Sequence, residues 1–173
     1  MKKLSHAEIA SQRLTIGAIT EKNRLPVVAL IDNVRSMYNV GSIFRTSDGA
    51  LIRKLVLSGF TPCPPRKEIE KTALGATKSI PWDYVPSPVE ALTGLRREGY
   101  RIFCLELTNE SGPYTSIQNS EFPICLVVGN EITGISKEVV EQCDRGIQIP
   151  MFGTKQSLNV AVAYGIAIFE LSR

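Results

Sequence analysis

The segment Ile124-Cys125-Leu126-Val127-Val128-Gly129-Asn130-Glu131 begins with five consecutive apolar residues and then turns polar. A strand with one solvent-exposed face alternates apolar and polar side chains, whereas a strand that is buried on both faces is apolar throughout. The segment therefore predicts an interior strand of a parallel sheet. The strand runs into an acidic turn that Gly129 and Gly134 flank.

The same kind of apolar run recurs on both sides of this segment and alternates with stretches of helical character. The runs with β character are Val27–Ile31, Lys54–Leu57, Trp82–Val85, Ile102–Leu105, Ile124–Val128 and Ile147–Ile149. The helical stretches are Val40–Leu51, Lys67–Leu74, Pro88–Glu98, Lys137–Cys143 and Leu158–Leu171. This alternation predicts an α/β fold, with a mostly parallel sheet and helices on both faces.

The chain has 173 residues, 43% hydrophobic and 21% charged, which predicts one folded domain and excludes a disordered chain. We expect residues 1–24 to form a basic N-terminal arm, with a helix near Ala7–Leu14, and residues 25–173 to form the domain. The net charge of +3 is already present in the first 25 residues, so the remainder is neutral. A surface for polyanions must therefore arise from local clustering.

Several classes of protein are disfavoured. The longest nearly unbroken apolar run, residues 160–169, is too short to span a membrane, and no apolar stretch of a signal peptide follows the first lysines. The four cysteines form no C-x-x-C pair, which disfavours zinc sites and is typical of a reduced, cytoplasmic protein. His6 is the single histidine, so we expect neither a Ser-His-Asp triad nor a metal site.

The usual nucleotide-binding signatures are also missing. No two glycines are separated by one residue, so G-x-G-x-x-G cannot occur. Two glycine pairs have the spacing of a P-loop, but Tyr100 and Ile135 follow them where the loop needs lysine. A classical dinucleotide or ATP site is therefore disfavoured.

Ligands of open parallel sheets bind outside the carboxyl ends of the strands, and three segments at such ends are unusual. Residues 32–48 contain Asn39 and, six residues later, Arg45. Residues 128–134 contain Glu131, and residues 149–163 pass through a polar loop to Ser157 and Asn159 before an almost wholly apolar helix.

These three segments, in this order and at these spacings, resemble the three motifs of the SpoU branch of the SPOUT superfamily. Its TrmH-like members are RNA 2′-O-ribose methyltransferases. The resemblance runs from about Pro26 to the C-terminus. It implies a deep C-terminal trefoil knot, S-adenosylmethionine as cofactor, RNA as substrate and a homodimer.

The resemblance also implies roles for individual residues. Arg45 would act at the ribose hydroxyl, Asn39 and Glu131 would place it, and Ser157 and Asn159 would order the pocket. A guanidinium is a poor base because its pKa exceeds about 12. We therefore expect Arg45 to bind the adjacent phosphate with two hydrogen bonds and to stabilise the developing alkoxide.

For the cofactor, the resemblance implies that main-chain groups of three loops hold the adenine, at Gly129, Ile149 and Leu158. The end of the strand 102–105 would supply a further wall at Leu105. Apolar side chains suffice at these positions because they form a slot for a flat base, while N–H and C=O groups give direction.

Each of these residues also has a purely structural interpretation. Asn39 alone fits a helix N-cap, and Arg45 fits a surface arginine paired with Asp48. Glu131 fits a solvated loop acid. Ser157 is a good N-cap, which would put Asn159 in the first turn of the last helix, where a polar amide beside a buried element needs a partner.

Residues 45–78 hold seven bases against three acids, and the proline-rich loop 61–67 ends in Arg66-Lys67. This stretch and the arm are candidate phosphate contacts. The arm is too short for a separate RNA-binding domain, which favours tRNA over rRNA. The alternatives are an rRNA 2′-O-methyltransferase, a catalytically silent knotted RNA-binding protein and a flavodoxin-like domain.

The last helix predicts an assembly. Residues 158–171 leave little polar face, and a helix that is apolar all round is expected to be buried all round. One side packs on the sheet, so we expect the other to pack on a second subunit of a homodimer, with Ile168 and Phe169 in the interface.

Overall fold

The structure is a computed structural model that describes residues 1–19 and 24–173. The strands are β1 Leu25–Asp32, β2 Ile52–Ser58, β3 Trp82–Val85, β4 Arg101–Leu105, β5 Gly112–Pro113, β6 Ile124–Val128 and β7 Arg145–Gln148. The α-helices are α1 His6–Ser11, α2 Met37–Gly49, α3 Lys67–Ala73, α4 Pro88–Arg97, α5 Lys137–Val140 and α6 Val160–Leu171. Four described 3-10 helices are η1 Ile16–Ala18, η3 Ala76–Lys78, η4 Tyr114–Ser116 and η5 Asn119–Glu121.

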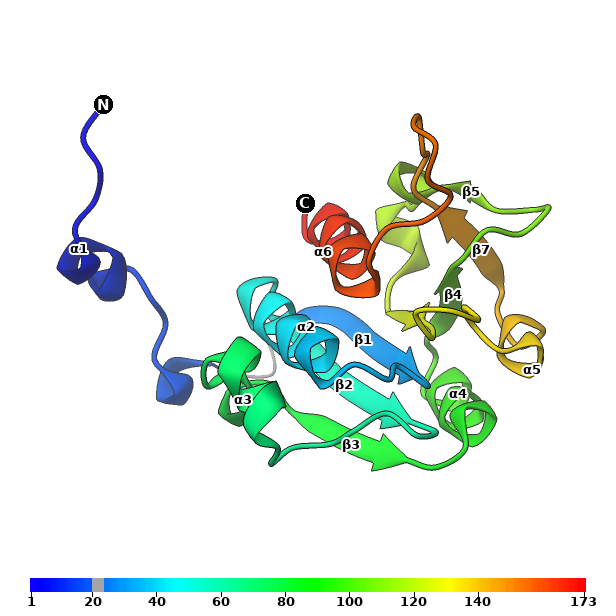
Figure 1. Ribbon diagram of the computed structural model, residues 1–173, viewed down its shortest axis with the longest axis horizontal. Coiled ribbons are helices and arrows are strands. Elements are labelled where there is room, and N and C mark those ends of the chain that lie inside the picture. Colours follow the sequence, from blue (N-terminus) through cyan, green and yellow to red (C-terminus); the bar gives the residue numbers. More distant parts are fainter. Residues whose placement is uncertain (20–23) are drawn as a thin grey trace.

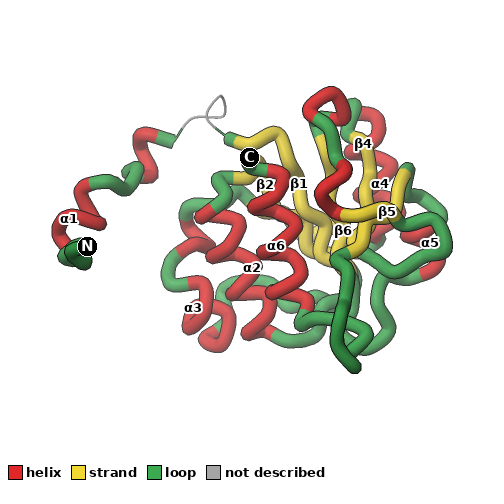
Figure 2. Tube along the Cα trace, turned by 90° about the horizontal axis from the view of Figure 1, so that it is seen from above, coloured by secondary structure: helices red, strands yellow, loops and turns green. Residues whose placement is uncertain are grey.

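The strands form one sheet in the order β3-β2-β1-β6-β4-β7-β5, and all the described pairings are parallel. Helices α2, α3 and α6 cover one face, and α4 and α5 cover the other (Figures 1 and 2). The expected α/β class, with a parallel sheet and helices on both faces, is confirmed. The deep trefoil knot stays a prediction from the resemblance.

Strand β1 shows why the central runs are apolar without interruption. Val27, Ala29 and Ile31 belong to the core under α2, α3 and α6. Val28 and Leu30 point to the opposite face and belong to the core under α4 and α5. Because successive side chains of a strand alternate between faces, both sets must be apolar when both faces are covered.

The strand order changes direction between the two central strands, β1 and β6. One edge carries β2 and β3 beyond β1, and the other carries β4, β7 and β5 beyond β6. Ile31 of β1 lies in register with Val128 of β6, so the residues that follow both strands emerge side by side. Such a switch point is where open α/β sheets form a crevice for a ligand.

Two close approaches fix the helix layer above this crevice. A Cβ on Gly41 of α2 would lie 2.1 Å from the Thr72 hydroxyl and 2.3 Å from the Ile69 carbonyl, so α3 packs tightly against this glycine. The buried hydroxyls of Ser47 and Tyr164 are 2.7 Å apart and join α2 to α6. Because the Ser47 hydroxyl donates to the carbonyl of Ile43, Tyr164 donates to Ser47.

The N-terminal arm lies apart from the sheet in both views, and none of the residues of α1 is buried. Part of the expected arm, residues 20–23, lies outside the described residues. Arg24 does not extend toward solvent as an arm residue would. Its guanidinium donates to the carbonyls of Ile52 and Ser79, which anchors the start of β1 to the domain.

Three expectations from the sequence are wrong in detail. Helix α2 begins earlier than Val40, because Ser36 is its N-cap and Asn39 lies in the first turn. Helix α6 begins at Val160 with Asn159 as its N-cap, so Ser157 does not cap it. The two-residue strand β5 was not expected, because Gly112–Pro113 carries no β signal.

Helix α6 is buried on one side only within the protomer. Ile168 is fully buried in the core, so the expectation that it lies in a subunit interface is wrong. Val162, Ile166 and Phe169 are exposed, and their spacing places them on one face of the helix. Within the described residues, no helix combines the length and the apolar character needed to cross a bilayer.

Candidate active site

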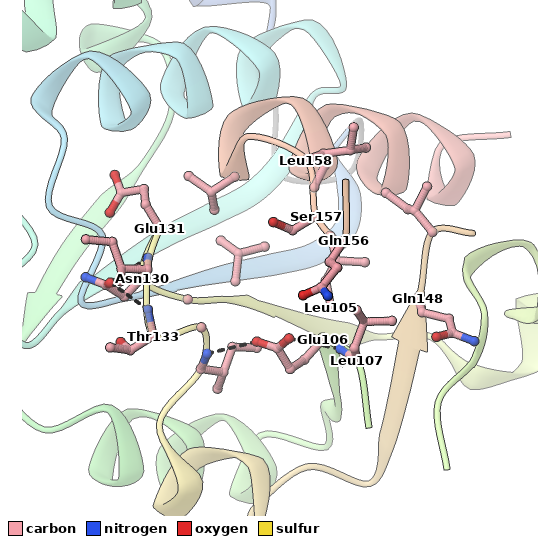
Figure 3. Close-up of a pocket in the computed structure, with 18 of the residues that line it drawn as sticks. Leu105, Glu106, Leu107, Asn130, Glu131, Thr133, Gln148, Gln156, Ser157 and Leu158 are labelled. Carbon is pink, nitrogen blue, oxygen red and sulfur yellow. Dashed lines mark hydrogen bonds between the residues drawn. The ribbon is translucent and has the colours of Figure 1, made fainter. Parts of the chain in front are cut away.

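A cavity of about 460 Å³ opens at the carboxyl ends of β4, β6 and β7. Its walls come from the loops after these strands and from the start of α6 (Figure 3). The residues expected at a cofactor all line it, namely Leu105, Gly129, Ile149 and Leu158. Four positions spread over residues 105–158 of the chain therefore meet around one space.

The loop after β6 is folded back tightly against its own strand. A Cβ on Gly129 would lie 2.4 Å from the Ile135 nitrogen and 2.5 Å from the Gly134 carbonyl carbon, so only glycine fits. Asn130 closes the turn, since its side-chain oxygen accepts the N–H groups of Ile132 and Thr133. Main-chain groups of this turn therefore form one wall of the cavity.

Glu106 joins this turn to the end of β4 at the opposite wall. Its carboxylate accepts the Ile135 N–H at 3.0 Å and the Leu107 N–H at 2.9 Å. Figure 3 shows Glu106 on the side of the cavity that faces Gln156 and Ser157. The cavity thus carries a carboxylate fixed by two main-chain donors.

Three of the expected catalytic residues form a single chain of hydrogen bonds. The Glu131 carboxylate accepts the N–H groups of Arg35 and Ser36, each at 2.9 Å, and the Asn39 amide at 2.8 Å. The Asn39 side-chain oxygen accepts the Asn159 amide at 3.1 Å. Glu131 is exposed in its loop, as a solvated acid would be, but it also ties the loop after β6 to the start of α2.

Asn159 completes this chain at the start of α6. Its side-chain oxygen accepts the N–H groups of Ala161 and Val162 at 3.0 and 3.4 Å, which satisfies two donors at the helix N-terminus. The polar amide next to the apolar helix thus has the partners that its position requires. Loops from three distant parts of the sequence are held in fixed relation.

The electrostatics of Glu131 follow from these contacts. Partial burial raises the pKa of its carboxyl, but the donors from Arg35, Ser36 and Asn39 outweigh this effect, and the pKa lies below its ordinary value. Hydrogen bonds to the ionised form favour that form. Glu131 is therefore a stable anion at neutral pH that acts as a structural acceptor.

Asp32 also holds the loops after β1 and β6 together. It was not singled out from the sequence. It is fully buried at the end of β1 and accepts the N–H and the hydroxyl of Ser136 and the Asn33 amide. Burial raises the pKa of this carboxyl, although the donors from Ser136 and Asn33 oppose the shift. An acid directly after an apolar strand was the available signal.

Ser157 and Arg45 lie differently from the other three residues. Ser157 is exposed and lines the cavity beside Gln156 (Figure 3). Arg45 lies on α2, about 9 Å along the helix axis from Asn39, and is not among the residues that line the cavity. It forms no ion pair with the described part of the chain, and Asp48 instead accepts the Ser79 hydroxyl. The interpretation of Arg45 as the partner of Asp48 is therefore wrong.

Arg45 belongs to a set of exposed cations on the α2 and α3 side of the molecule. None of them forms an ion pair within the described residues, whereas Arg96 on α4 pairs with Asp144 and Arg145 on β7 pairs with Glu121. We call this set the basic face. Its members are Arg35, Arg45, Arg66, Lys67, Lys71 and Lys78.

The sequence matches the SpoU rRNA Methylase family over residues 26–169. It is 35% identical over 156 residues to a tRNA (guanosine(18)-2′-O)-methyltransferase from Aquifex aeolicus, which covers 90% of this chain and 72% of that protein. It is 28% identical over 148 residues to the 23S rRNA (guanosine-2′-O-)-methyltransferase RlmB of Neisseria meningitidis, which covers 86% of this chain and 58% of that protein.

Solved structures agree with this relationship. The crystal structure of the A. aeolicus TrmH/SpoU tRNA modifying enzyme superposes with a TM-score of 0.78 at 34% identity, over 87% of this chain and 76% of that one. An AdoMet-bound rRNA methyltransferase from Sinorhizobium meliloti has a TM-score of 0.78 at 28% identity, over 87% and 58%. The chain spans about 60% of the length of several curated relatives. It belongs to the SpoU rRNA Methylase family.

Proposed function

We propose that this protein is an RNA methyltransferase that transfers a methyl group from S-adenosylmethionine to a ribose 2′-hydroxyl, with tRNA as its substrate. The hydrogen-bond chain from Glu131 through Asn39 to Asn159 carries the proposal. It joins the three motif segments directly beside the cavity. A fold that needed only stability would not require polar residues from three loops to meet at the sheet's switch point.

The cavity fits the cofactor in size and in chemistry. Its volume of about 460 Å³ falls within the range of about 300–1,000 Å³ that small-molecule sites occupy. Leu105, Ile149 and Leu158 offer apolar walls for a flat base, and the turn after Gly129 offers main-chain groups. The carboxylate of Glu106 provides a negative charge suited to a cationic ligand.

The reaction needs alignment more than activation. When bound, S-adenosylmethionine supplies a methyl group on a positively charged sulfur, which is a good leaving group. Arg45 binds the phosphate next to the target ribose and stabilises the negative charge that develops on the 2′-oxygen as its proton leaves. Asn39 and Glu131 hold the start of α2, and therefore Arg45, in place.

The active unit is a homodimer formed through α6. Val162, Ile166 and Phe169 make an exposed apolar stripe, while Val160 and Ala163 of the same helix line the cavity. A second subunit on this stripe would lie beside the cavity entrance. The exposed Arg45, which does not line its own protomer's cavity, would then serve the cavity of the partner subunit.

The RNA class follows from the basic face. Its exposed cations offer several phosphate contacts on one side of the domain, which suits a compact structured RNA such as tRNA. The 1–24 arm adds bases to this surface, and residues 25–173 act as the catalytic domain. We place the protein in the cytoplasm, in keeping with its four free thiols.

The proposal is tested with purified protein and unmodified tRNA. Isothermal calorimetry should show one S-adenosylmethionine bound per chain. Incubation with tRNA and methyl-labelled cofactor, followed by nucleoside mass spectrometry, should yield a 2′-O-methylated nucleoside. If the protein binds the cofactor and methylates rRNA but not tRNA, the substrate is rRNA. Cofactor binding without methylation of either RNA would support the catalytically silent RNA-binding alternative.

A further inference from the structure

A second hollow, of about 650 Å³, opens at the carboxyl ends of β2 and β3. It lies between the loop 59–66 and the side chain of Tyr84. Its lining includes two exposed aromatic residues, Phe60 (61% exposed) and Tyr84 (46% exposed), together with Arg66. The roles proposed so far do not use these two exposed aromatic side chains.

The hollow is rigid, because hydrogen bonds fix its loop to the end of β1. The Tyr84 hydroxyl donates to the Gly59 carbonyl at 2.7 Å, and the Phe60 N–H donates to the Asn33 side chain at 3.1 Å. The buried Thr61 hydroxyl donates to the Ile31 carbonyl and accepts from a main-chain N–H. The Tyr84 ring and the main chain that carries Phe60 are therefore held in place before any ligand arrives.

The same short segment connects the hollow to the candidate active site. Asn33 holds Phe60 with its side-chain oxygen and accepts the Asn130 amide with its main-chain carbonyl. Arg35 and Ser36, two and three residues later, bind Glu131. A ligand that spans this segment would touch the hollow and the site at once.

The charge around the hollow is positive. Arg66 lines it, Lys67 follows directly, and Arg35 and Lys71 are further exposed cations of the basic face. Exposed rings beside unpaired cations are the features with which proteins bind unpaired nucleotides, because every base has a face that stacks and every linkage has a negative phosphate. A basic surface for duplex RNA alone would not need the rings.

We propose that this hollow binds an unpaired base of the substrate RNA, stacked on Phe60 and Tyr84, with Arg66 on its phosphate. The proposal rests on the proposed function and deepens it, because it assigns a place to a nucleotide other than the one methylated. It means that the enzyme selects its ribose within a loop or another unpaired stretch of the RNA.

The test compares two labelled probes by fluorescence anisotropy, a single-stranded adenosine dodecamer and an RNA duplex of the same length. Phe60→Ala and Tyr84→Ala should each weaken binding of the single strand by roughly fivefold to a hundredfold, without changing the salt dependence. Binding of the duplex should change by less than about twofold, because its bases cannot stack on the rings. Arg66→Ala should weaken both probes and reduce the log–log salt slope by about 0.7–0.9.

Three controls make the result unambiguous. Phe60→Tyr keeps a stacking ring and should restore binding of the single strand. Leu74→Ala removes an exposed apolar side chain from the end of α3, outside the hollow, and should bind as the unmodified protein does. The heat of S-adenosylmethionine binding should be the same in all variants, which checks that each is folded.

The failures of the two proposals are distinguishable. The base-binding role is overturned, even if tRNA is methylated, in either of two cases. In the first, the ring variants bind the single strand as tightly as the unmodified protein does. In the second, their affinity for the duplex falls as much as their affinity for the single strand. If the unmodified protein methylates no RNA but the ring variants lose affinity for the single strand alone, the hollow is supported as a nucleotide site and the proposed enzymatic function fails.

Discussion

Asn159 uses both ends of its amide, and this double use shows how single residues organise the site. Its oxygen caps α6 and its nitrogen donates to Asn39. An aspartate would keep the cap but lose the donor, and a serine would be too short to do both. The residue therefore couples the position of the last helix to that of α2 and, through Asn39, to Glu131.

Replacing Arg45 by alanine should separate chemistry from cofactor binding. We expect the single-turnover methylation rate to fall by about a hundredfold or more, because the charge that develops on the ribose oxygen loses its stabiliser. The affinity for S-adenosylmethionine should stay within a few-fold, since Arg45 does not line the cavity. Rapid-quench kinetics and calorimetry measure the two quantities. Arg97→Ala on α4, across the sheet, is the matched control, and a near-normal rate for Arg45→Ala would refute the role.

Glu131→Gln should lower the stability by about 1–2 kcal/mol at neutral pH, because one oxygen that accepts N–H donors becomes a donor itself. The pKa of Glu131 is lowered by folding, so its contribution is present above the unfolded pKa of about 4.3 and disappears as the pH falls through the folded value. Urea unfolding at several pH values should therefore show the two proteins converging below about pH 4. Glu110→Gln, on an exposed loop, should show no such convergence, and a gap that stayed constant into acid would contradict the assignment.

At the scale of the elements, the layer that carries Arg45 depends on how closely two helices approach. Helix α3 reaches α2 only because residue 41 has no side chain. Helix α6 is joined to the same helix by the buried pair of Ser47 and Tyr164. The basic face is therefore built on packed helices, with its cations on the outer surface.

Two glycine-to-alanine changes should have opposite effects. In a helix interior alanine is favoured over glycine by about 0.5–1 kcal/mol, and Gly94→Ala on α4 should gain about this much because its Cβ would meet open space. Gly41→Ala should instead lose about 1–3 kcal/mol, because the new methyl group would overlap the main chain of α3 at Ile69. Thermal or urea unfolding measures both. Equal gains for the two variants would show that α3 can move away at little cost.

At the scale of the whole molecule, α6 leaves an apolar stripe uncovered at Val162, Ile166 and Phe169. Burying such a stripe against its own copy is the simplest closed arrangement, since a two-fold axis pairs the same surface with itself. The stripe flanks the cavity, so assembly and catalysis would be linked. Phe169 also lies over Gly49 of α2, and about half of the residue remains exposed.

Phe169→Glu should convert the dimer to a monomer and reduce methylation at the same time. The half-exposed position accepts a charge without a loss of core packing, but a carboxylate opposite its own copy would repel it. Light scattering at micromolar concentration and a methylation assay measure the two effects. Leu74→Glu, at an exposed apolar site directly after α3, should stay dimeric. A monomer that retained full activity would separate assembly from function.

The sequence determined the fold class, because local patterns are enough for it. Runs such as 27–31 and 124–128 are apolar on both faces, and only covered parallel strands need this. It also pointed to Asn39, Glu131 and Asn159, through segments after strands that resemble the SpoU motifs. The caps at Ser36 and Asn159 were misjudged, since several polar residues near a helix start can serve and only the backbone path decides between them.

Only the tertiary structure showed which distant residues are in contact. Glu131 and Asn39 are 92 residues apart, and their contact exists because β1 and β6 are neighbours in the sheet, a pairing that no local pattern encodes. The tertiary structure also showed that Ile168 is core while Phe169 is surface, which an apolar helix without a polar face cannot reveal. Likewise, the loop after β2 becomes a hollow only when Tyr84 of β3 stands beside Phe60. Sequence specifies which segments are buried, whereas the packing of distant segments specifies which side chains share a site.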